Sequence, residues 1–134
     1  MDAFKLKVVT PERVFFEDDV EMVEFNTTEG EIGIYKNHVP TTVIIKPGVL
    51  NIYMADSEKT VKKAALHEGF VEILGDRVTI LAEVIEWPDE IDEERAERSK
   101  ERAEKRLSEK ATGTDVDRAT AALLRAMARI NVIR

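Results

Sequence analysis

The feature that most constrains the fold of this chain is a change of hydrophobic period at Trp87-Pro88. Before it, short segments such as residues 4–8 and 78–81 alternate apolar and polar side chains and are rich in Val, Ile and Phe, which predicts β-strands. After it, apolar residues recur every three or four positions, which predicts helices. Pro88 fits the boundary because proline does not sit in a central strand and disfavours helix in the residue before it. We therefore predict two units, residues 1–87 and 88–134.

The first unit has the turn spacing of a two-layered β fold. Turn-forming residues interrupt it at 28–31, 46–48, 55–58 and 75–76. Many short strands joined by regular turns are typical of a sandwich or a barrel. Together with the helical second unit, this predicts the α+β class.

The second unit reads as a helical hairpin. Carboxylates crowd its start, where they suit the positive end of a helix dipole, so we expect a helix from Asp89 to about Lys110. Residues 111–114 break the pattern, and Thr114 or Asp115 is placed to cap a second helix. The short break predicts antiparallel packing. The apolar stripe of the first helix consists mostly of small residues, so we expect the hairpin to be only marginally docked.

Composition excludes several classes of function. The formal net charge of −7 and the pI of about 5.0 argue against a nucleic-acid binder. The chain has no cysteine, which excludes disulfides and thiolate metal sites. Its longest apolar runs are far shorter than the roughly 20 residues of a membrane span. The first residues lack the basic and apolar segments of a signal peptide, so we expect neither a signal peptide nor direct insertion into a membrane.

No catalytic or metal-binding motif stands out. The glycines at 30 and 33 lack the Lys-Ser/Thr of a phosphate-binding loop and precede an apolar strand instead of a helix. His38 and His67 have no metal-ligand spacing. No Ser/His/Asp arrangement is recognisable. We therefore assign no catalytic and no metal-binding residue, and a small enzyme is the least favoured function.

Four charged residues of the second unit form a possible ligand site. Counted from Thr112 at the centre of the break, Arg95 and Arg129 each lie 17 residues away, so antiparallel helices place them at one level. Arg125 is one turn from Arg129, and Asp92 is one turn before Arg95. Three clustered guanidiniums suit phosphate oxygens, and a carboxylate accepts a hydrogen bond from an amino or hydroxyl group. On the residues alone, ordinary surface ion pairs with the many acidic side chains explain the arginines better.

Several sequence runs, taken in order, resemble the epsilon subunit of F-type ATP synthases over the whole chain. They are VVTPE at 8–12, EDDVEMV at 17–23, EGEIGIYKNHVP at 29–40, KPGVL at 46–50, GFVE at 69–72 and VTILA at 78–82. The resemblance implies a flattened β-sandwich of about ten strands followed by an antiparallel two-helix hairpin. It implies a non-catalytic subunit of the central stalk that joins the gamma subunit to the ring of c subunits. Such a complex lies at the cytoplasmic face of the cell membrane, with this subunit peripheral.

The resemblance also implies ATP as a regulatory ligand, and it leaves the need for Mg²⁺ open. Bacterial members that bind ATP carry the motif Ile/Leu-Asp-x-x-Arg-Ala, which is complete here at residues 91–96. The implied ATP-binding residues are Glu86, Ile91, Asp92, Arg95, Ala96, Arg125 and Arg129. ATP favours the folded hairpin, whereas the extended hairpin reaches the alpha and beta subunits and obstructs ATP hydrolysis. Residues 68–69 are Glu-Gly where the family commonly has Gly-Gly.

The segment from Glu29 to His38 resembles the loop that faces the ring. The implied contacts with the ring or the gamma subunit are Glu29, Gly30, Glu31 and His38. The alternative function is a stand-alone ATP-binding sensor, which would form no complex with a gamma subunit.

Overall fold

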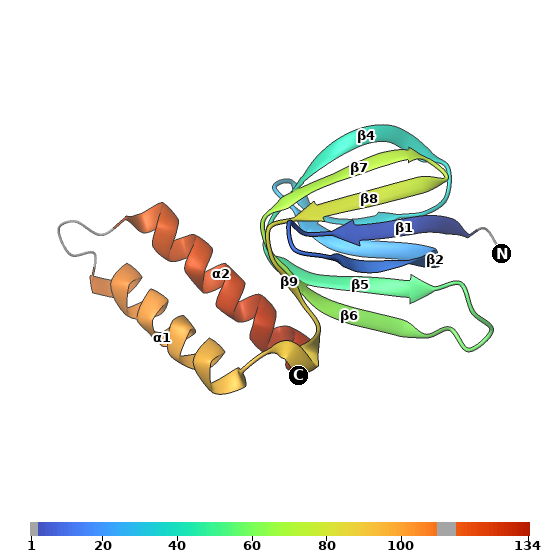
Figure 1. Ribbon diagram of the computed structural model, residues 1–134. Helices are drawn as coiled ribbons and strands as arrows, with labels where there is room; N and C mark the ends of the chain where they lie inside the picture. The colour runs from blue at the N-terminus through green and yellow to red at the C-terminus, as the bar shows by residue number, and fades with distance from the viewer. Residues whose placement is uncertain (1–2, 110–114) are drawn as a thin grey trace.

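A computed structural model describes residues 3–109 and 115–134 and contains, in that part of the chain, nine strands followed by two α-helices (Figure 1). The predicted α+β class, with a β-sandwich ahead of two helices, is confirmed, although we expected about ten strands. The strands are β1 (Phe4–Val9), β2 (Val14–Thr27), β3 (Gly30–Ile34), β4 (His38–Ile45), β5 (Gly48–Met54), β6 (Val61–Leu66), β7 (Gly69–Gly75), β8 (Arg77–Ala82) and β9 (Ile85–Glu86). A 3-10 helix, η1 (Pro88–Glu90), precedes α1 (Glu93–Glu109) and α2 (Val116–Ile133).

The nine strands form one hydrogen-bonded sheet that folds over itself into two layers. Its order is β1-β8-β7-β4-β2-β5-β6-β9, with β3 beside β2. The long strand β2 joins the layers because it pairs with β1 along its first half and with β3 and β5 along its second half. The β1–β8 pair is parallel, and the other pairs are antiparallel.

The core between the layers follows the period-two pattern of the sequence. In β1, Phe4, Leu6 and Val8 are buried while Lys5 is exposed. Alternate side chains of a strand point to opposite faces, so one face of β1 fills the core and the other meets solvent. Each large apolar side chain buried in this way contributes roughly 1.5–3 kcal/mol.

The boundary at Trp87-Pro88 is a rigid corner. The Trp87 ring stacks on Phe15, with centroids 4.2 Å apart. The Glu90 carboxylate accepts a hydrogen bond from the Trp87 backbone N–H at 2.9 Å. The same carboxylate accepts two hydrogen bonds from Arg13, at 3.0 and 2.8 Å. Side chains from the β1–β2 segment thus hold η1 against the sandwich.

The prediction that a helix begins at Asp89 is wrong. Residues 88–90 form η1 instead, and Ile91 is extended (φ −99°, ψ 130°). The α-helix begins at Glu93 because Asp92 caps it: its Oδ1 accepts a hydrogen bond from the Arg95 N–H at 3.1 Å. A side-chain cap of this kind satisfies an amide that has no partner within the helix.

The helix α2 lies between α1 and the sandwich, where it contacts β5 and β6 (Figure 1). Its N-cap is Asp115, whose Oδ1 accepts from the Arg118 N–H at 3.0 Å, as one of the two predicted caps requires. The other predicted cap, Thr114, the predicted helix end at Lys110 and the predicted break at 111–114 lie outside the described residues. No helix in the described part of the chain is long and apolar enough to cross a membrane.

Small side chains make up most of the helix packing. The buried residues of α1 are Ala96 and Ala103. Ala128 and Val132 of α2 form a small apolar cluster with Ala65 of β6. Alanine removes little apolar area from water, so the hairpin is attached to the sandwich by a much smaller apolar contact than the one within the sandwich.

Candidate functional site

A pocket of about 260 Å³ opens where η1, α1 and α2 meet. It is lined by Glu86, Glu90, Ile91, Asp92, Arg95, Ala96, Ser99 and Arg129. Six of the seven residues that the sequence predicts for one ligand therefore line one pocket. The seventh, Arg125, is not part of the lining. The helical register counted from Thr112 had predicted that Arg95 and Arg129 lie at one level, and both face this pocket.

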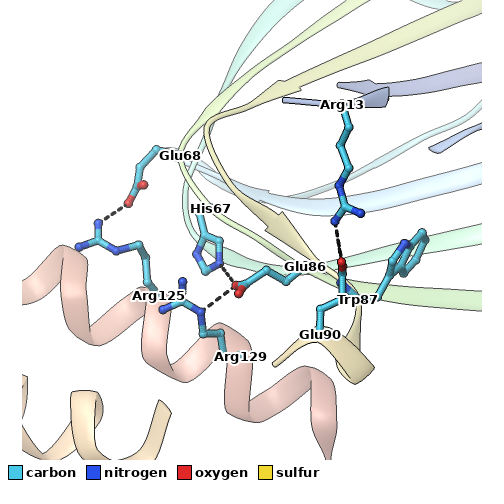
Figure 2. A network of polar contacts seen from close by, with 8 residues as sticks. All are labelled: Arg13, His67, Glu68, Glu86, Trp87, Glu90, Arg125 and Arg129. Carbon is cyan, nitrogen blue, oxygen red and sulfur yellow. Dashed lines mark hydrogen bonds and ion pairs between the residues drawn. The ribbon is translucent and has the colours of Figure 1, made fainter. Parts of the chain in front are cut away.

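Arg129 enters the pocket wall through an ion pair with Glu86 (Figure 2). Its Nε donates a hydrogen bond to Glu86 Oε1 at 2.7 Å, and both side chains are about three-quarters buried. Burial raises the pKa of Glu86, but hydrogen bonds from His67 and Arg129, with the charge of Arg129, outweigh it and hold that pKa below its usual value. Glu86 is therefore an ionised acceptor at neutral pH.

A hydrogen bond from His67, in the interior of the sandwich, positions the Glu86 carboxylate. Its ring is fully buried, and Nε2 lies 3.0 Å from the same Glu86 oxygen. An ionised carboxylate only accepts hydrogen bonds, so the imidazole donates from Nε2. Its Nδ1 is buried with no hydrogen-bond partner in the described structure. The ring thus fixes the carboxylate in place.

Arg125 is held away from the pocket by Glu68. Its Nη1 donates to Glu68 Oε1 at 2.8 Å. Glu68 lies in the turn between β6 and β7, and Figure 2 shows Arg125 and Arg129 reaching from successive turns of α2 to two different carboxylates. The three arginines that the sequence groups together are thus not gathered around one point.

Asp92 and Arg95 form the part of the pocket wall that comes from the start of α1. One oxygen of Asp92 is engaged as the helix cap. The Arg95 side chain has no ion pair among the described residues. An anionic ligand would therefore pair with the Arg95 guanidinium without first displacing a carboxylate from that side chain. The pocket is just below the roughly 300–1,000 Å³ typical of small-molecule sites.

Four residues of this region were not predicted from the sequence to belong to the site. Ser99 lies one helical turn beyond Arg95 and Ala96, so helical spacing could have found it. Glu68 stands where the family commonly has glycine, and this departure could have drawn attention to it. His67 and Glu90 carried no usable signal, because their roles depend on how distant strands and turns meet.

The predicted contact residues do not share one loop. Residues 30–34 form β3, so Glu29, Gly30 and Glu31 lie at one end of a strand and His38 lies beyond its other end. His38 pairs with Gly75, at the opposite end of β4 from Ile45. Strand pairing with β2 straightened the expected loop, and these residues belong to two different ends of the sandwich.

A second hollow, of about 540 Å³, lies at the end of the sandwich near the N-terminus and contains none of the predicted site residues. It is lined by Ala3, Phe4, Lys5, Lys7, Glu17, Asp19, Lys36, Asp76 and Arg77. No group of three or more His, Cys, Asp or Glu residues suited to a metal ion occurs in the described part of the chain.

Family models match both parts of the chain. The model described as "ATP synthase, Delta/Epsilon chain, beta-sandwich domain" matches residues 3–88, and "ATP synthase, Delta/Epsilon chain, long alpha-helix domain" matches residues 89–134. The ATP synthase epsilon chain of Caldicellulosiruptor bescii is 45% identical over 132 residues, which is 98% of this chain and 94% of that protein. The epsilon chain of Brevibacillus brevis is 48% identical over 132 residues and covers 98% of both.

Solved structures share the fold at low sequence identity. A chain in the Euglena gracilis mitochondrial ATP synthase (OSCP/F1/c-ring) matches with a TM-score of 0.84 and 18% identity, over 100% of this chain and 83% of that chain. A chain in the central stalk and c-ring of the Tetrahymena thermophila mitochondrial ATP synthase matches with a TM-score of 0.57 and 14% identity, over 96% and 92%.

Proposed function

The chain belongs to the ATP synthase epsilon chain family, and from this premise we propose that it regulates ATP hydrolysis through its C-terminal hairpin. It acts in the central stalk of an F-type ATP synthase, between the gamma subunit and the ring of c subunits. The complex lies at the cytoplasmic face of the cell membrane, with this subunit peripheral and without catalytic activity of its own. The observation that carries the regulatory proposal is the pocket that brings Asp92 and Arg95 of α1 next to Arg129 of α2.

This pocket exists only while the hairpin is folded. Its walls come from η1, from both helices and from Glu86 of β9. ATP bound there, with phosphate oxygens on Arg95 and Arg129, stabilises the folded arrangement alone. A ligand shifts a conformational balance only by its difference in affinity for the two states. ATP therefore disfavours the extended hairpin, which contacts the alpha and beta subunits and obstructs hydrolysis.

The contacts that hold the hairpin support a reversible change. The helix α1 buries mainly alanines, and α2 meets the sandwich through a small apolar cluster and partly exposed ion pairs. Reversing a 1:99 population needs about 5.5 kcal/mol of differential binding. ATP of modest affinity thus biases the balance instead of fixing it.

The outer face of β4 and β7 supports a place within a larger assembly. Ile44 is 61% exposed, Leu74 52% and Phe70 43%. Ile44 and Phe70 are direct partners across the two strands. Contiguous exposed apolar residues often mark a surface for another protein. We assign this β4–β7 face to the gamma subunit, with His38 at its border.

The regulatory role is tested by following the hairpin with a distance probe. The chain has no cysteine, so Ser57→Cys and Ser108→Cys, both at exposed positions, give one pair of dyes for energy transfer. In the complex with a gamma subunit, ATP is added with and without Mg²⁺. ATP should raise the folded fraction. The proposal fails if millimolar ATP leaves the distance distribution unchanged.

The matched variants are Arg95→Ala and Arg98→Ala. Both remove an exposed arginine from α1, but Arg95 lines the pocket, whereas Arg98 lies outside the lining and pairs weakly with Glu94 at 3.8 Å. The ATP response should disappear in the first variant and persist in the second. Equal responses in both would show that ATP acts elsewhere.

A further inference from the structure

Glu68 and Arg125 form the ion pair that leaves the pocket incomplete. Arg125 and Arg129 are four residues apart on α2 and so lie on the same face of the helix. Arg129 lines the pocket, and Arg125 instead donates to Glu68 at 2.8 Å. The Glu68 carboxylate is 43% exposed and the Arg125 side chain 33%, so solvent reaches this pair and the contact can exchange.

We propose that Glu68 is an internal competitor of the nucleotide: it binds the Arg125 guanidinium that phosphate oxygens would otherwise take, which weakens ATP binding and holds the hairpin folded without ATP. This inference rests on the proposed function. Carboxylate and phosphate oxygens are both acceptors for the same guanidinium donors. Arg125 turns fully toward a triphosphate at Arg95 and Arg129 only when its Nη1 leaves Glu68.

Glu68 is the carboxylate suited to this exchange, and Glu86 is not. Glu86 receives hydrogen bonds from two side chains, Arg129 and the fully buried His67. Glu68 receives one, from Arg125, among the described residues. The side chain of Glu86 is also only 23% exposed. Moving Glu86 away would take its carboxylate from both Arg129 and the fully buried His67, whereas a displaced Glu68 loses one partner and turns into solvent.

The size of the effect follows from the exposure of the pair. Ion pairs that are partly open to water are weak, and their loss changes an equilibrium by at most about fivefold. The Glu68–Arg125 pair already stabilises the folded hairpin without ATP. Glu68 therefore limits how far ATP can shift the balance between the folded and the extended hairpin.

The test is calorimetric titration of the full chain with ATP, comparing wild type with Glu68→Gln. The matched control is Glu83→Gln, which removes one exposed carboxylate from the nearby β8–β9 turn, where no ion pair is found among the described residues. We expect Glu68→Gln to bind ATP about two- to fivefold more tightly, and Glu83→Gln to bind like wild type. Without nucleotide, Glu68→Gln should have a lower folded fraction by energy transfer.

A second comparison separates competition from a merely structural effect. In an Arg125→Ala background, Glu68→Gln should change neither ATP affinity nor folded fraction, because the two residues act as one pair. The inference is overturned if wild type binds ATP and Glu68→Gln binds it no more tightly, while the proposed function stands. If neither wild type nor any variant binds millimolar ATP, the proposed ATP site is wrong, and the proposed competition by Glu68 is wrong as well.

Discussion

Arg129 and Glu86 are joined at 2.7 Å, and the accepting oxygen also lies 3.0 Å from a fully buried imidazole, His67. One carboxylate oxygen therefore links α2 to the interior of the sandwich across 43 residues of sequence. Because Glu86 also lines the pocket, the stability of the hairpin and the state of the ligand site depend on the same residue.

Replacing Arg129 by Ala should release α2 from the sandwich. The Glu86 carboxylate then keeps only its hydrogen bond with His67, and a buried acceptor that loses its partner costs about 1–3 kcal/mol. Hydrogen exchange of the α2 amides should become roughly five- to a hundredfold faster. Arg118→Ala, at an exposed site in the first turn of α2, is the control. Unchanged protection of α2 in Arg129→Ala would contradict the role of this pair.

Docking of the hairpin should weaken in acid. The net pKa of Glu86 in the folded chain lies below its ordinary value of 4.5. A carboxyl group with a lowered folded-state pKa stabilises the fold above its unfolded pKa and loses that contribution as the pH falls through the folded value. Energy transfer should report a falling folded fraction below about pH 4.5. In Glu86→Gln this step should be smaller, and an identical profile would assign it to other groups.

Asp92 has two roles that one pair of variants separates. Asp92→Ala removes the α1 cap, which should cost about 1 kcal/mol of helix stability. Asp92→Ser restores a capping oxygen but not the carboxylate. Helix stability should recover in the serine variant, as circular dichroism during urea unfolding would show, while ATP affinity should be lowered in both. If serine restored ATP binding fully, Asp92 would serve only as a cap.

Trp87 should be a stability determinant of the sandwich. Its removal eliminates the stack on Phe15 and the packing of the ring against the sandwich core. Since the ring is partly exposed, we expect Trp87→Ala to lower the free energy of unfolding by about 2–4 kcal/mol. Tyr35→Ala, which removes a 61% exposed aromatic, should stay within roughly 0.5 kcal/mol of wild type. Urea denaturation measures both.

Ile44→Asp should weaken binding to a gamma subunit at the β4–β7 face. The side chain is 61% exposed, so the fold tolerates the charge, while burial of an unpaired carboxylate at an interface costs several kcal/mol. Thr41→Asp is the control, because Thr41 is also exposed on β4 but pairs with the buried Ile73 and so lies on the opposite side of the strand from Ile44. Binding of purified gamma subunit at equal strength by all three proteins would remove this surface from the proposal. A stand-alone sensor would not bind gamma at all.

The sequence was informative wherever a fixed period governs the structure. Alternation in residues 4–8 identified the buried face of β1, since side chains along a strand point to opposite sides. The count from Thr112 placed Arg95 and Arg129 at one pocket because every α-helix rises by the same amount per residue. Neither argument needs knowledge of distant contacts.

The sequence was uninformative where a side chain finds a partner far along the chain. Arg125 and Glu68 are 57 residues apart, and nothing local to either indicates their contact. The extended conformation of Ile91, which separates η1 from α1, likewise depends on the corner held by Arg13. Local propensity at residues 89–91 favoured one continuous helix, and tertiary contacts overrode it.

The corner at η1 also limits the geometry of any movement of the hairpin. Trp87 and Glu90 are fixed to the sandwich, and α1 begins at Glu93, so rotation is confined to Ile91 and Asp92. With 17 residues at about 1.5 Å each, α1 is a rod roughly 25 Å long. The far end of α1 therefore lies at about that distance from the corner in any position that the helix takes.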